Sequence, residues 1–318
     1  MQKLNHIPTL SDIEETHIAI EKMIHRTPVL TNHSINQIAG ADLFFKCENF
    51  QKVGAFKMRG GASVALRLSD AEKQAGVATH SSGNHAQAVA RSAQLLGIPA
   101  YIVMPENAPA IKKAATKDYG AEIILCESTL AGREATLKKV VAKTGATFLH
   151  PYNDYNIIAG QATAAKELIE DTDELDIIMA PIGGGGLASG TALSTRYLAP
   201  KAKTIGTEPK IVDDAYRSFK SGTMQVNTNI NTIADGLRTN LGEKTFDIIH
   251  RYLEDVITVT EESIIQAMRL VWERMKILIE PSAAVPLAAV LSNKERFQGK
   301  KVGIIFSGGN IDLGKLPF

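Results

Sequence analysis

Short apolar runs alternate with longer mixed segments along this chain from Gly76 onward. Runs such as AYIVMP and LDIIMAPI are continuous rather than alternating, which is typical of parallel strands buried on both faces. The segments between them, such as NHAQAVARSAQLLG and AGQATAAKELIE, predict helices. Strands that alternate with helices indicate an α/β protein with parallel sheet and right-handed crossovers. The predicted strands are residues 76–80, 100–105, 121–126, 146–151, 175–182, 202–208 and 300–310, and the predicted helices are residues 84–97, 108–120, 132–145, 159–170, 187–199, 260–275 and 282–292.

The N-terminal segment predicts a further helix. Ser11 and Glu14 have the spacing of a capping box, and Ile13, Ile20 and Ile24 follow as apolar positions. The pattern predicts about four helical turns after this cap.

The length of the chain favours two lobes. At 318 residues the chain exceeds the usual size of one domain. The sequence contains neither an internal repeat nor a Pro/Ser-rich linker. We therefore expect the chain to cross between the lobes more than once.

Composition and charge narrow the class of protein. Hydrophobic residues make up 44% and charged residues 22%, as in globular proteins with a core. The formal net charge of +1 argues against a nucleic-acid binder or a membrane-surface protein. The two cysteines, Cys47 and Cys126, do not indicate a disulfide framework. The sequence shows neither a signal peptide at its N-terminus nor an apolar stretch of transmembrane length, so it predicts a cytoplasmic protein.

Four consecutive glycines lie between a predicted strand and a predicted helix, in APIGGGGLASG. Gly183, Gly184, Gly185 and Gly186 have no Cβ to block a ligand. Their N–H groups and the positive end of the following helix form a site for an anion, above all a phosphate. A glycine-rich tight turn without a ligand is the alternative interpretation.

The same glycine run is compatible with a dinucleotide. Gly183, Gly185 and Ala188 satisfy the fingerprint G-x-G-x-x-G/A, and Glu208 ends a strand about 20 residues later. An NAD-dependent dehydrogenase is therefore a rival hypothesis from a different enzyme class. The fingerprint does not explain the lysine and the polar turn described next.

A lysine and further polar turns accompany the glycines. In NFQKVGAFKMRGG, Lys57 is surrounded by small residues and an aromatic residue, which a surface lysine does not need. THSSGNHAQAV places Ser81, Ser82, Asn84 and His85 between a strand and a helix, where hydroxyls, an amide and free helix N–H groups suit a carboxylate. Simple helix capping is the alternative. Near the C-terminus, FSGGNID forms another such turn.

Together these motifs indicate a cofactor and a family. Open α/β sheets bind ligands at the carboxyl ends of their strands, and an amine beside an anion site and a hydroxyl-lined pocket predicts pyridoxal phosphate (PLP) bound to the lysine as an imine. The sequence resembles the fold-type II PLP enzymes, which are tryptophan synthase β-like, and within them the serine racemase and serine/threonine dehydratase branch. The resemblance covers nearly the whole chain and is carried by HRTPVLT, FFKCENFQKVGAFKMRGG, HSSGNHAQAV, GGGGLASG, TIADG, LVWERMKILIEPSAAV and FSGGNID.

This resemblance implies a two-domain α/β fold with twisted parallel sheets and helices on both faces. Residues 1–70 and 150–318 are expected to form a large PLP-binding domain. Residues 71–149 are expected to form a small mobile domain, whose closure excludes water. The resemblance also implies a homodimer.

The resemblance assigns cofactor contacts. The lysine of the GAFK-type motif, which is Lys57 here, forms the imine with PLP in this family. Phe56 is expected beside the pyridine ring, the glycines at 183–186 around the phosphate, and Asn84 at the ring hydroxyl. Ser307 is expected at the pyridine nitrogen, where a neutral hydroxyl makes the ring a weaker electron sink than a carboxylate would. This favours prompt loss of a β-hydroxyl over transamination.

The resemblance also assigns substrate contacts. Ser81, Asn84 and His85 are expected to hold the substrate carboxylate, and Arg133 to close over the substrate. Ser82 resembles the acid/base of serine racemases on the cofactor face opposite the lysine, where threonine dehydratases commonly have alanine. A helix-capping role for this serine is the alternative.

The segment EPKIVDD resembles the divalent-cation site of serine racemases. Glu208, Asp214 and the backbone carbonyl of Val212 are expected to bind Mg²⁺ or Mn²⁺ together with waters. A solvated acidic loop is the alternative, and Lys210 departs from the racemase pattern. Glu280 matches a family glutamate near the pyridine ring, for which a helix-start acid is the alternative.

The implied activity is conversion of L-serine or L-threonine to a 2-oxo acid and ammonia, with Lys57 as the base at Cα and serine racemisation as a companion. L-threo-3-hydroxyaspartate is the alternative substrate, and its second carboxylate would need a cation such as Arg133 or Arg238. A protein that binds PLP without turnover is a further alternative. His150 and Trp272 need no function, because strand-end and helix-face positions explain them.

Overall fold

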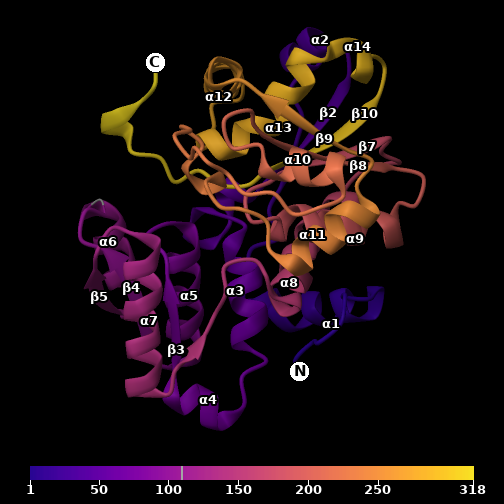
Figure 1. The fold of residues 1–318 in the computed structure, drawn as a ribbon. Helices are drawn as coiled ribbons and strands as arrows, with labels where there is room; N and C mark the ends of the chain where they lie inside the picture. Colours follow the sequence, from indigo (N-terminus) through magenta and orange to yellow (C-terminus); the bar gives the residue numbers. More distant parts are fainter. Residues whose placement is uncertain (109) are drawn as a thin grey trace.

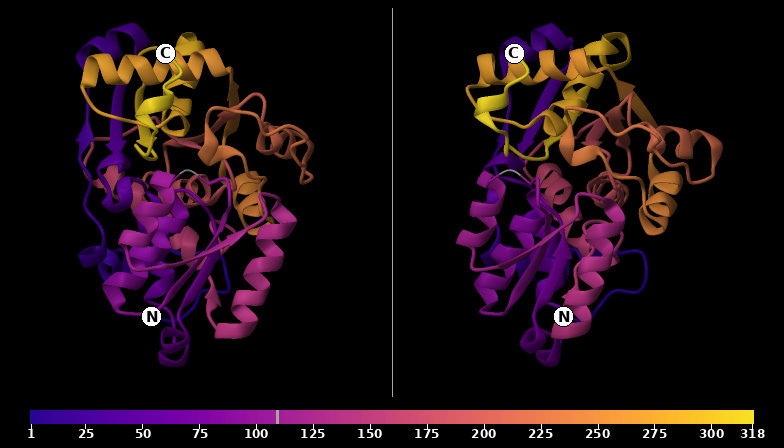
Figure 2. Two further views of the ribbon diagram at one scale, coloured as in Figure 1. Left: turned by 90° about the vertical axis from the view of Figure 1, so that its left-hand side faces the viewer. Right: turned by 60° about the vertical axis from the view of Figure 1, so that its left-hand side comes forward.

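The computed structural model describes residues 1–108 and 110–318, with residues 110–112 described by their backbone alone. The strands form two separate sheets, which lie in different parts of the molecule (Figure 1). Figure 2 shows the same division from two further directions, with the smaller sheet and its helices on the opposite side from the C-terminal helices. The predicted α/β fold with parallel sheets is confirmed.

The larger sheet has six strands in the order β1-β2-β10-β7-β8-β9. β1 is antiparallel to β2, and all other neighbouring strands are parallel. Its strands are β1 Val29–Leu30, β2 Asp42–Cys47, β7 Ile177–Pro181, β8 Lys203–Pro209, β9 Asp255–Val259 and β10 Lys301–Phe306. Because β2 pairs with β10, the N-terminal and C-terminal parts of the chain build one sheet.

The smaller sheet has four parallel strands in the order β5-β4-β3-β6. Its strands are β3 Val77–His80, β4 Ala100–Pro105, β5 Glu122–Cys126 and β6 Thr147–Phe148. All four lie within residues 71–149, whereas the larger sheet uses residues on both sides of this segment. The movement of one lobe against the other stays a prediction.

The helices are α1 Leu10–Ile20, α2 His33–Ala39, α3 Lys57–Ala65, α4 Asp70–Ala75, α5 Asn84–Leu96, α6 Ala110–Asp118, α7 Leu130–Thr144, α8 Tyr155–Glu170, α9 Gly186–Leu198, α10 Asp214–Ser221, α11 Glu243–Tyr252, α12 Glu261–Met275, α13 Pro281–Ser292 and α14 Lys294–Phe297. α2, α12 and α13 pack on one face of the larger sheet, and α1, α8, α9 and α11 pack on the other. α5 and α7 pack on different faces of the smaller sheet. In the part of the chain that the structure describes, no helix has both the length and the apolar character needed to cross a membrane.

Alternate residues of the central strands enter different cores. In β7, Ile177 and Met179 belong to one buried cluster, while Ile178 and Ala180 belong to the other. Successive side chains of a strand point to opposite faces of the sheet, so a strand covered on both faces is apolar at every position. This explains the continuous apolar runs of the sequence.

The start of α1 differs from the prediction. The N-cap is Thr9, whose side chain accepts from the N–H of Asp12, while the Asp12 carboxylate accepts from the N–H of Thr9 at 2.8 Å. Ser11 and Glu14 lie inside the helix, so a capping box at these residues is wrong. Thr9 takes the cap because its backbone is extended, and the helix already begins at Leu10.

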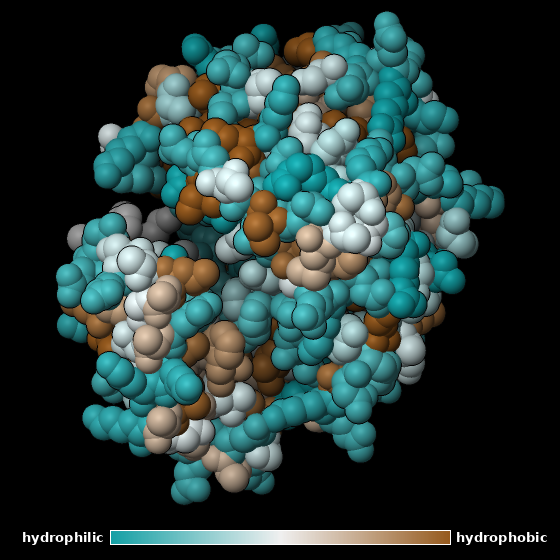
Figure 3. Space-filling view, in the orientation of Figure 1, coloured by the Kyte–Doolittle hydropathy of each residue, from teal (hydrophilic) through white to brown (hydrophobic). Residues whose placement is uncertain are grey.

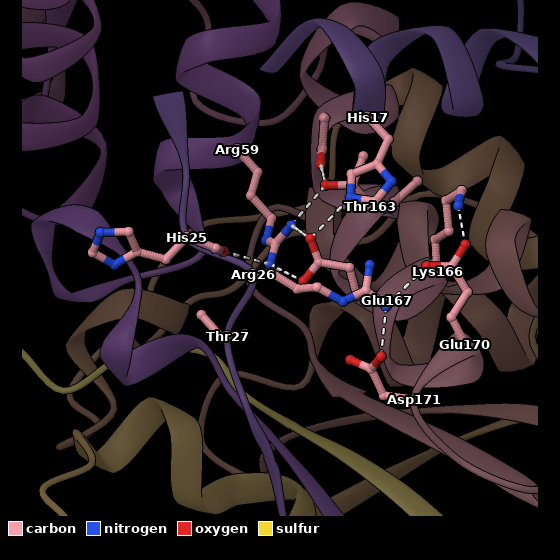
Figure 4. A network of polar contacts seen from close by, with 12 residues as sticks. His17, His25, Arg26, Thr27, Arg59, Thr163, Lys166, Glu167, Glu170 and Asp171 are labelled. Carbon is pink, nitrogen blue, oxygen red and sulfur yellow. Dashed lines mark hydrogen bonds and ion pairs between the residues drawn. The ribbon is translucent and has the colours of Figure 1, made fainter. Parts of the chain in front are cut away.

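The first turn of α3 is anchored by buried ion pairs. Arg59 is fully buried and donates two hydrogen bonds to each of the carboxylates of Glu48 and Glu167, at 2.7–2.8 Å. Figure 4 shows the Arg59 side chain directed at Glu167 of α8. Lys46 adds a second buried cation 2.7 Å from Glu167. A Cβ on Gly160 would lie 2.5 Å from the Arg59 carbonyl oxygen, so the backbones of α3 and α8 are in contact.

Candidate active site

Several helix starts and one strand end carry the predicted site residues. Lys57 begins α3 and Asn84 begins α5. Gly186 begins α9, Glu280 precedes α13, and Ser307 follows β10. Figure 3 shows a hollow on one face of the molecule, where the parts that contain the two sheets in Figure 1 meet. Helix starts and the carboxyl ends of parallel strands are the usual ligand sites of open α/β sheets.

The amine of Lys57 lies at the start of α3 in a desolvated setting. Nζ donates a hydrogen bond of 2.8 Å to the carbonyl oxygen of Pro151 and lies 5.0 Å from the centroid of the Phe56 ring. Burial lowers the pKa of Lys57 to about 8, although the charge of Glu280 opposes this shift. The N–H of Phe56 donates to the Ser307 carbonyl at 3.0 Å, which joins the lysine segment to β10. A lysine with this pKa is partly neutral near neutral pH and can act as nucleophile or base.

Glu280 and Asn84 form a polar pair in the same site. Asn84 Nδ2 donates to both carboxylate oxygens of Glu280, at 3.0 and 3.1 Å. Asn310 Nδ2 donates to Asn84 Oδ1 at 2.9 Å. A Cβ on Gly308 would lie 2.9 Å from Glu280 Oε1, so the carboxylate can approach the end of β10 only because this residue is glycine. The structure brings Asn84 and Glu280 together near Lys57, and their roles toward a cofactor stay predictions.

The glycine run forms the turn from β7 into α9. Gly185 is the N-cap with a φ of +87°, and none of the described side chains caps α9. A Cβ on Gly184 would overlap the ring of Tyr152, and Thr245 Oγ1 donates to the Gly184 carbonyl at 2.8 Å. The first N–H groups of α9 therefore lie in a turn that only residues without Cβ can form. This turn fits the phosphate of PLP.

The serine turn leads from β3 into α5. Gly83 is the N-cap of α5, and none of the described side chains caps this helix. Ser81 Oγ accepts instead from the N–H of Gly83 at 3.3 Å. The alternative in which Ser82 caps the helix is therefore wrong. The N–H groups of the first turn of α5 suit a carboxylate.

The ring of His85 is buried and neutral. Nε2 lies 3.0 Å from the carbonyl oxygen of Leu149, while Nδ1 is buried without a hydrogen-bond partner among the described residues. Because a carbonyl oxygen only accepts, Nε2 carries the proton and Nδ1 is an acceptor. Burial, with the charge of Lys57 as the next cause, lowers the pKa of His85 to about 3. This imidazole cannot donate to a substrate carboxylate, whereas the backbone N–H of His85 can.

The two arginines considered for a second carboxylate lie in different settings. Arg133, in the first turn of α7, is partly exposed and donates from Nε to the Thr129 carbonyl at 3.3 Å. Burial and then the charge of Arg133 lower the pKa of His80, which ends β3. Arg238 donates twice to the Thr232 carbonyl, at 2.6 and 3.2 Å. Arg133 therefore lies near the carboxyl end of the smaller sheet, and both arginines already donate to a backbone carbonyl.

Glu208 and Asp214 lie near each other at the end of β8 and the start of α10. Burial raises the pKa of Glu208 well above its ordinary value and that of Asp214 to about 6, and the charge of Asp214 adds to the effect on Glu208. The nearby Arg217 forms its ion pair with Asp213, at 2.7 Å. Among the described residues, no cluster of three or more His, Cys, Asp or Glu side chains could hold a metal ion. The two carboxylates fit a divalent cation in charge, and a third protein ligand would have to be the backbone carbonyl of the buried Val212.

The sequence analysis missed the segment next to Lys57. His150 follows β6, and its Nδ1 accepts from the N–H groups of Tyr152 and Asn153, at 3.2 and 2.9 Å. The carbonyl of Pro151, within this turn, accepts from Lys57. A signal was present in the sequence, because HPYND begins within the last two residues of the strand predicted at 146–151 and ligand-site residues gather at such ends.

Comparisons with known proteins agree with this site. Residues 20–308 match the family described as pyridoxal-phosphate dependent enzyme. The chain is 49% identical over 313 residues to the beta-hydroxyaspartate dehydratase of Paracoccus denitrificans, covering 98% of this chain and 99% of that protein. It is 49% identical over 312 residues to the serine racemase of Dictyostelium discoideum, covering 97% and 96%. A crystal structure of the Dictyostelium discoideum serine racemase aligns with a TM-score of 0.92 and 50% identity, covering 96% of this chain and 99% of that one.

The family match resolves the choice between the two phosphate ligands. The matched residues include both Lys57 and the glycine run. A dinucleotide site would explain the glycine run but would give Lys57 no role. The interpretation as an NAD-dependent dehydrogenase is thereby set aside. The chain belongs to the family of pyridoxal-phosphate-dependent enzymes.

Proposed function

We propose that this protein converts a small β-hydroxy amino acid to a 2-oxo acid and ammonia, and that it also racemises serine. The observation that carries the proposal is the amine of Lys57, whose pKa burial lowers to about 8 at the start of α3. The relatives support it, because one is named a beta-hydroxyaspartate dehydratase and another a serine racemase.

The cofactor would be held by Lys57, by the glycine turn around its phosphate, and by Asn84 and Ser307 beside its ring. When bound, PLP withdraws electrons from the substrate Cα and makes the Cα–H bond acidic. Lys57, with its amine free, would take the proton from Cα. The β-hydroxyl then leaves with a proton as water, and hydrolysis of the released enamine and imine gives the 2-oxo acid and ammonia.

The substrate carboxylate is proposed to bind at the start of α5. The N–H groups of Asn84 and His85 belong to a first turn that none of the described side chains caps, and Ser81 adds a hydroxyl. We propose that His85 binds the substrate carboxylate through its backbone N–H alone. Its ring cannot donate to a carboxylate, because Nε2 already donates to the Leu149 carbonyl and Nδ1 is an acceptor. Ser82 is proposed as the acid/base on the second face of Cα, where donation of a proton inverts the amino acid.

L-Serine and L-threonine are the leading substrates, and L-threo-3-hydroxyaspartate is the alternative. The Paracoccus denitrificans relative supports the alternative, because its name specifies beta-hydroxyaspartate. Arg133 is the proposed partner of the second carboxylate. Arg238 is less suited, because it donates two hydrogen bonds to the Thr232 carbonyl, whereas Arg133 donates one longer bond, of 3.3 Å, to the Thr129 carbonyl.

Three further features are proposed from the family resemblance. Glu208, Asp214 and the Val212 carbonyl would bind Mg²⁺ or Mn²⁺, which the buried pair of carboxylates supports. Two copies of the chain would form a homodimer. The cytoplasmic location also stays a prediction.

The activity is tested by incubating the purified protein with PLP, Mg²⁺ and each of the three amino acids. Chiral chromatography measures D-serine, and the 2-oxo acids are quantified in the same samples. D-Serine together with pyruvate supports both proposed activities, and pyruvate alone supports a dehydratase without racemisation. A 2-oxo acid only from L-threo-3-hydroxyaspartate would select the alternative substrate, and no product from any of the three would contradict the proposal.

Replacement of the lysine tests the mechanism. Lys57→Ala is expected to abolish the visible absorption of lysine-bound cofactor and to lower turnover at least about 10³-fold, because Lys57 is proposed to act both as the nucleophile that binds the cofactor and as the base at Cα. Lys52→Ala is the matched control, because Lys52 lies nearby in the sequence and donates to the Lys22 carbonyl outside the site. Turnover retained in Lys57→Ala would overturn the mechanism.

A further inference from the structure

We infer that His150 is a positioning residue for Lys57, acting through the carbonyl oxygen of Pro151. The inference deepens the proposed function and rests on it, because it concerns the lysine proposed as the base at Cα. The sequence alone indicated no function for His150, and the structure places it one residue from Pro151, whose carbonyl accepts a hydrogen bond from the lysine amine.

The imidazole of His150 organises a backbone turn. Its Nδ1 accepts from the N–H groups of Tyr152 and Asn153, at 3.2 and 2.9 Å. Since both partners are donors, Nδ1 is the nitrogen without a proton. Side chains of Asn, Asp and Ser close turns in the same way by accepting the N–H two residues later. The Pro151 carbonyl lies inside this turn and accepts from Lys57 Nζ at 2.8 Å.

Neighbouring rings hold the imidazole in place. The ring of His150 is edge-on to Phe148, with centroids 5.7 Å apart, and to Tyr152, with centroids 4.7 Å apart. Tyr152 in turn packs against the glycine turn, because its ring atoms fill the space beside Gly184. One short segment thus contacts the lysine through a carbonyl and the proposed phosphate site through a ring.

The hydrogen bond to Pro151 orients the amine. A neutral amine that donates one N–H to a carbonyl cannot direct its lone pair along the same axis, so the lone pair occupies one of the remaining tetrahedral positions. When the side chain is not bonded to the cofactor, the carbonyl therefore restricts where Lys57 can accept the proton of Cα. Small errors of position at a reacting atom cost about 10²-fold in rate.

The charges around the turn keep the imidazole unprotonated. Burial, followed by the charge of Lys57, lowers the pKa of His150 to about 4. The charges of His80 and Lys244 lower its pKa further, and that of Asp154 raises it. Glu134 and Lys138 line the same hollow as His150, and the Tyr152 ring lies against it. Protonation of Nδ1 would remove the acceptor and open the turn. His150 is also a poor base beside Lys57, because Nδ1 already accepts two N–H groups and its pKa is low.

Three substitutions separate the acceptor from the bulk and the charge of the ring. His150→Asn keeps an acceptor that can close the turn, His150→Leu keeps apolar bulk without an acceptor, and His150→Asp keeps the acceptor and adds a negative charge. His250→Leu is the matched control, because His250 also contacts two aromatic rings but lies on α11 outside the site.

Two readouts are needed, one of which does not use the cofactor. In the cofactor-free protein, the rate at which an amine-selective reagent modifies Lys57 is measured across pH by peptide mass spectrometry, which gives the titration midpoint of the amine. In the PLP-loaded protein, kcat and KM are measured for L-serine. Thermal unfolding of every variant shows whether the fold is retained.

We expect His150→Leu to lower kcat about 10²-fold with KM changed less than threefold, since the carboxylate site at α5 is untouched. The midpoint of Lys57 should move to lower pH, because the ammonium loses an acceptor. His150→Asn should stay within threefold of wild type for kcat. His150→Asp should move the midpoint to higher pH, because a nearby negative charge favours the ammonium form.

The outcomes distinguish this inference from the proposed function. If His150→Leu is folded and has the kcat and the Lys57 midpoint of wild type, the positioning role is wrong. Equal losses in the Asn and Leu variants, with equal losses in Tm, would show that the ring has only a structural role. If Lys57→Ala keeps its turnover, the proposed function itself fails, whatever the His150 variants show.

Discussion

His85 and His150 are both neutral histidines near Lys57 with the proton on Nε2, yet they form their hydrogen bonds through different ring nitrogens. His85 donates from Nε2 to the Leu149 carbonyl, and His150 accepts at Nδ1 from two N–H groups. Burial is the largest cause of the lowered pKa in both. At the scale of single residues, the lowered pKa values make both imidazoles weaker bases than the amine of Lys57, which is therefore the stronger candidate to take a proton from Cα.

The residue scale also predicts the origin of racemisation. Ser82→Ala is expected to lower D-serine formation about 10²-fold while pyruvate formation stays within threefold. Elimination needs only the transfer of the Cα proton to Lys57, whereas racemisation also needs a proton donor on the opposite face of Cα. Chiral chromatography of D-serine and pyruvate from one sample gives the ratio. Ser81→Ala is the control, since the Ser81 hydroxyl accepts from Gly83 at 3.3 Å and its loss should raise KM without changing the ratio. An unchanged ratio in Ser82→Ala would exclude the proposed role.

Helix α3, which begins at Lys57, is held by ion pairs on the side opposite the lysine. Residues two positions apart on a helix point in nearly opposite directions, so Lys57 can face the site while Arg59 faces the buried carboxylates. Glu48 and Glu167 reach Arg59 from a segment that follows β2 and from α8. The start of α3 is therefore located by charges from distant parts of the chain rather than by a local cap.

At the scale of this element, Arg59→Met is expected to lower the free energy of unfolding by about 3–5 kcal/mol, because the buried Glu48 would lose the guanidinium that pairs with it, while Glu167 would keep only its contacts with Lys46 and His17. Urea unfolding monitored by circular dichroism measures the change. The control is Arg269→Met, which breaks an exposed i,i+4 pair with Glu273 and should cost less than about 1 kcal/mol. Equal stability of Arg59→Met and wild type would show that methionine packing compensates for the lost charges.

At the scale of the whole molecule, the proposed cation site joins segments that are separate in the sequence. Asp214 accepts from Asn227 Nδ2 at 2.6 Å and from the N–H of Leu241 at 2.9 Å, while Glu208 ends β8. Raised pKa values in the folded state mean that ionising these carboxyl groups opposes folding. The cost is therefore absent at low pH and develops as the pH rises through the folded-state pKa.

A bound divalent cation would remove this cost. We expect Mg²⁺ to raise Tm more at pH 8 than at pH 5, on the two sides of the Asp214 pKa of about 6. Differential scanning fluorimetry with Mg²⁺ or EDTA measures the shift. Glu208→Gln should abolish the effect, whereas Asp213→Asn should keep it, because Asp213 pairs with Arg217. The solvated acidic loop considered from the sequence is wrong, because Glu208 and Asp214 are both buried. A shift that is the same at both pH values, or that survives in Glu208→Gln, would contradict a cation site at these two carboxylates.

The sequence predicted the central elements closely and the edges poorly. The strand expected at residues 175–182 is Ile177–Pro181, and the helix expected at 84–97 is Asn84–Leu96. Asp255–Val259 was not predicted, because an edge strand with half-buried positions lacks a continuous apolar run. Asp42–Cys47 was also missed, because Lys46 interrupts its apolar run although the side chain is fully buried.

The sequence by itself determined the α/β fold, the lysine and the glycine turn, because strand burial and the absence of Cβ atoms are properties of consecutive residues. Only the tertiary structure decided the partners of the charged and polar groups. Lys46 is buried because Glu167 lies against it, and Lys57 is oriented by Pro151, far along the chain. Hydrogen bonds and ion pairs act over a few ångströms in space, so the two partners can be widely separated in the sequence. A local sequence pattern therefore cannot predict them.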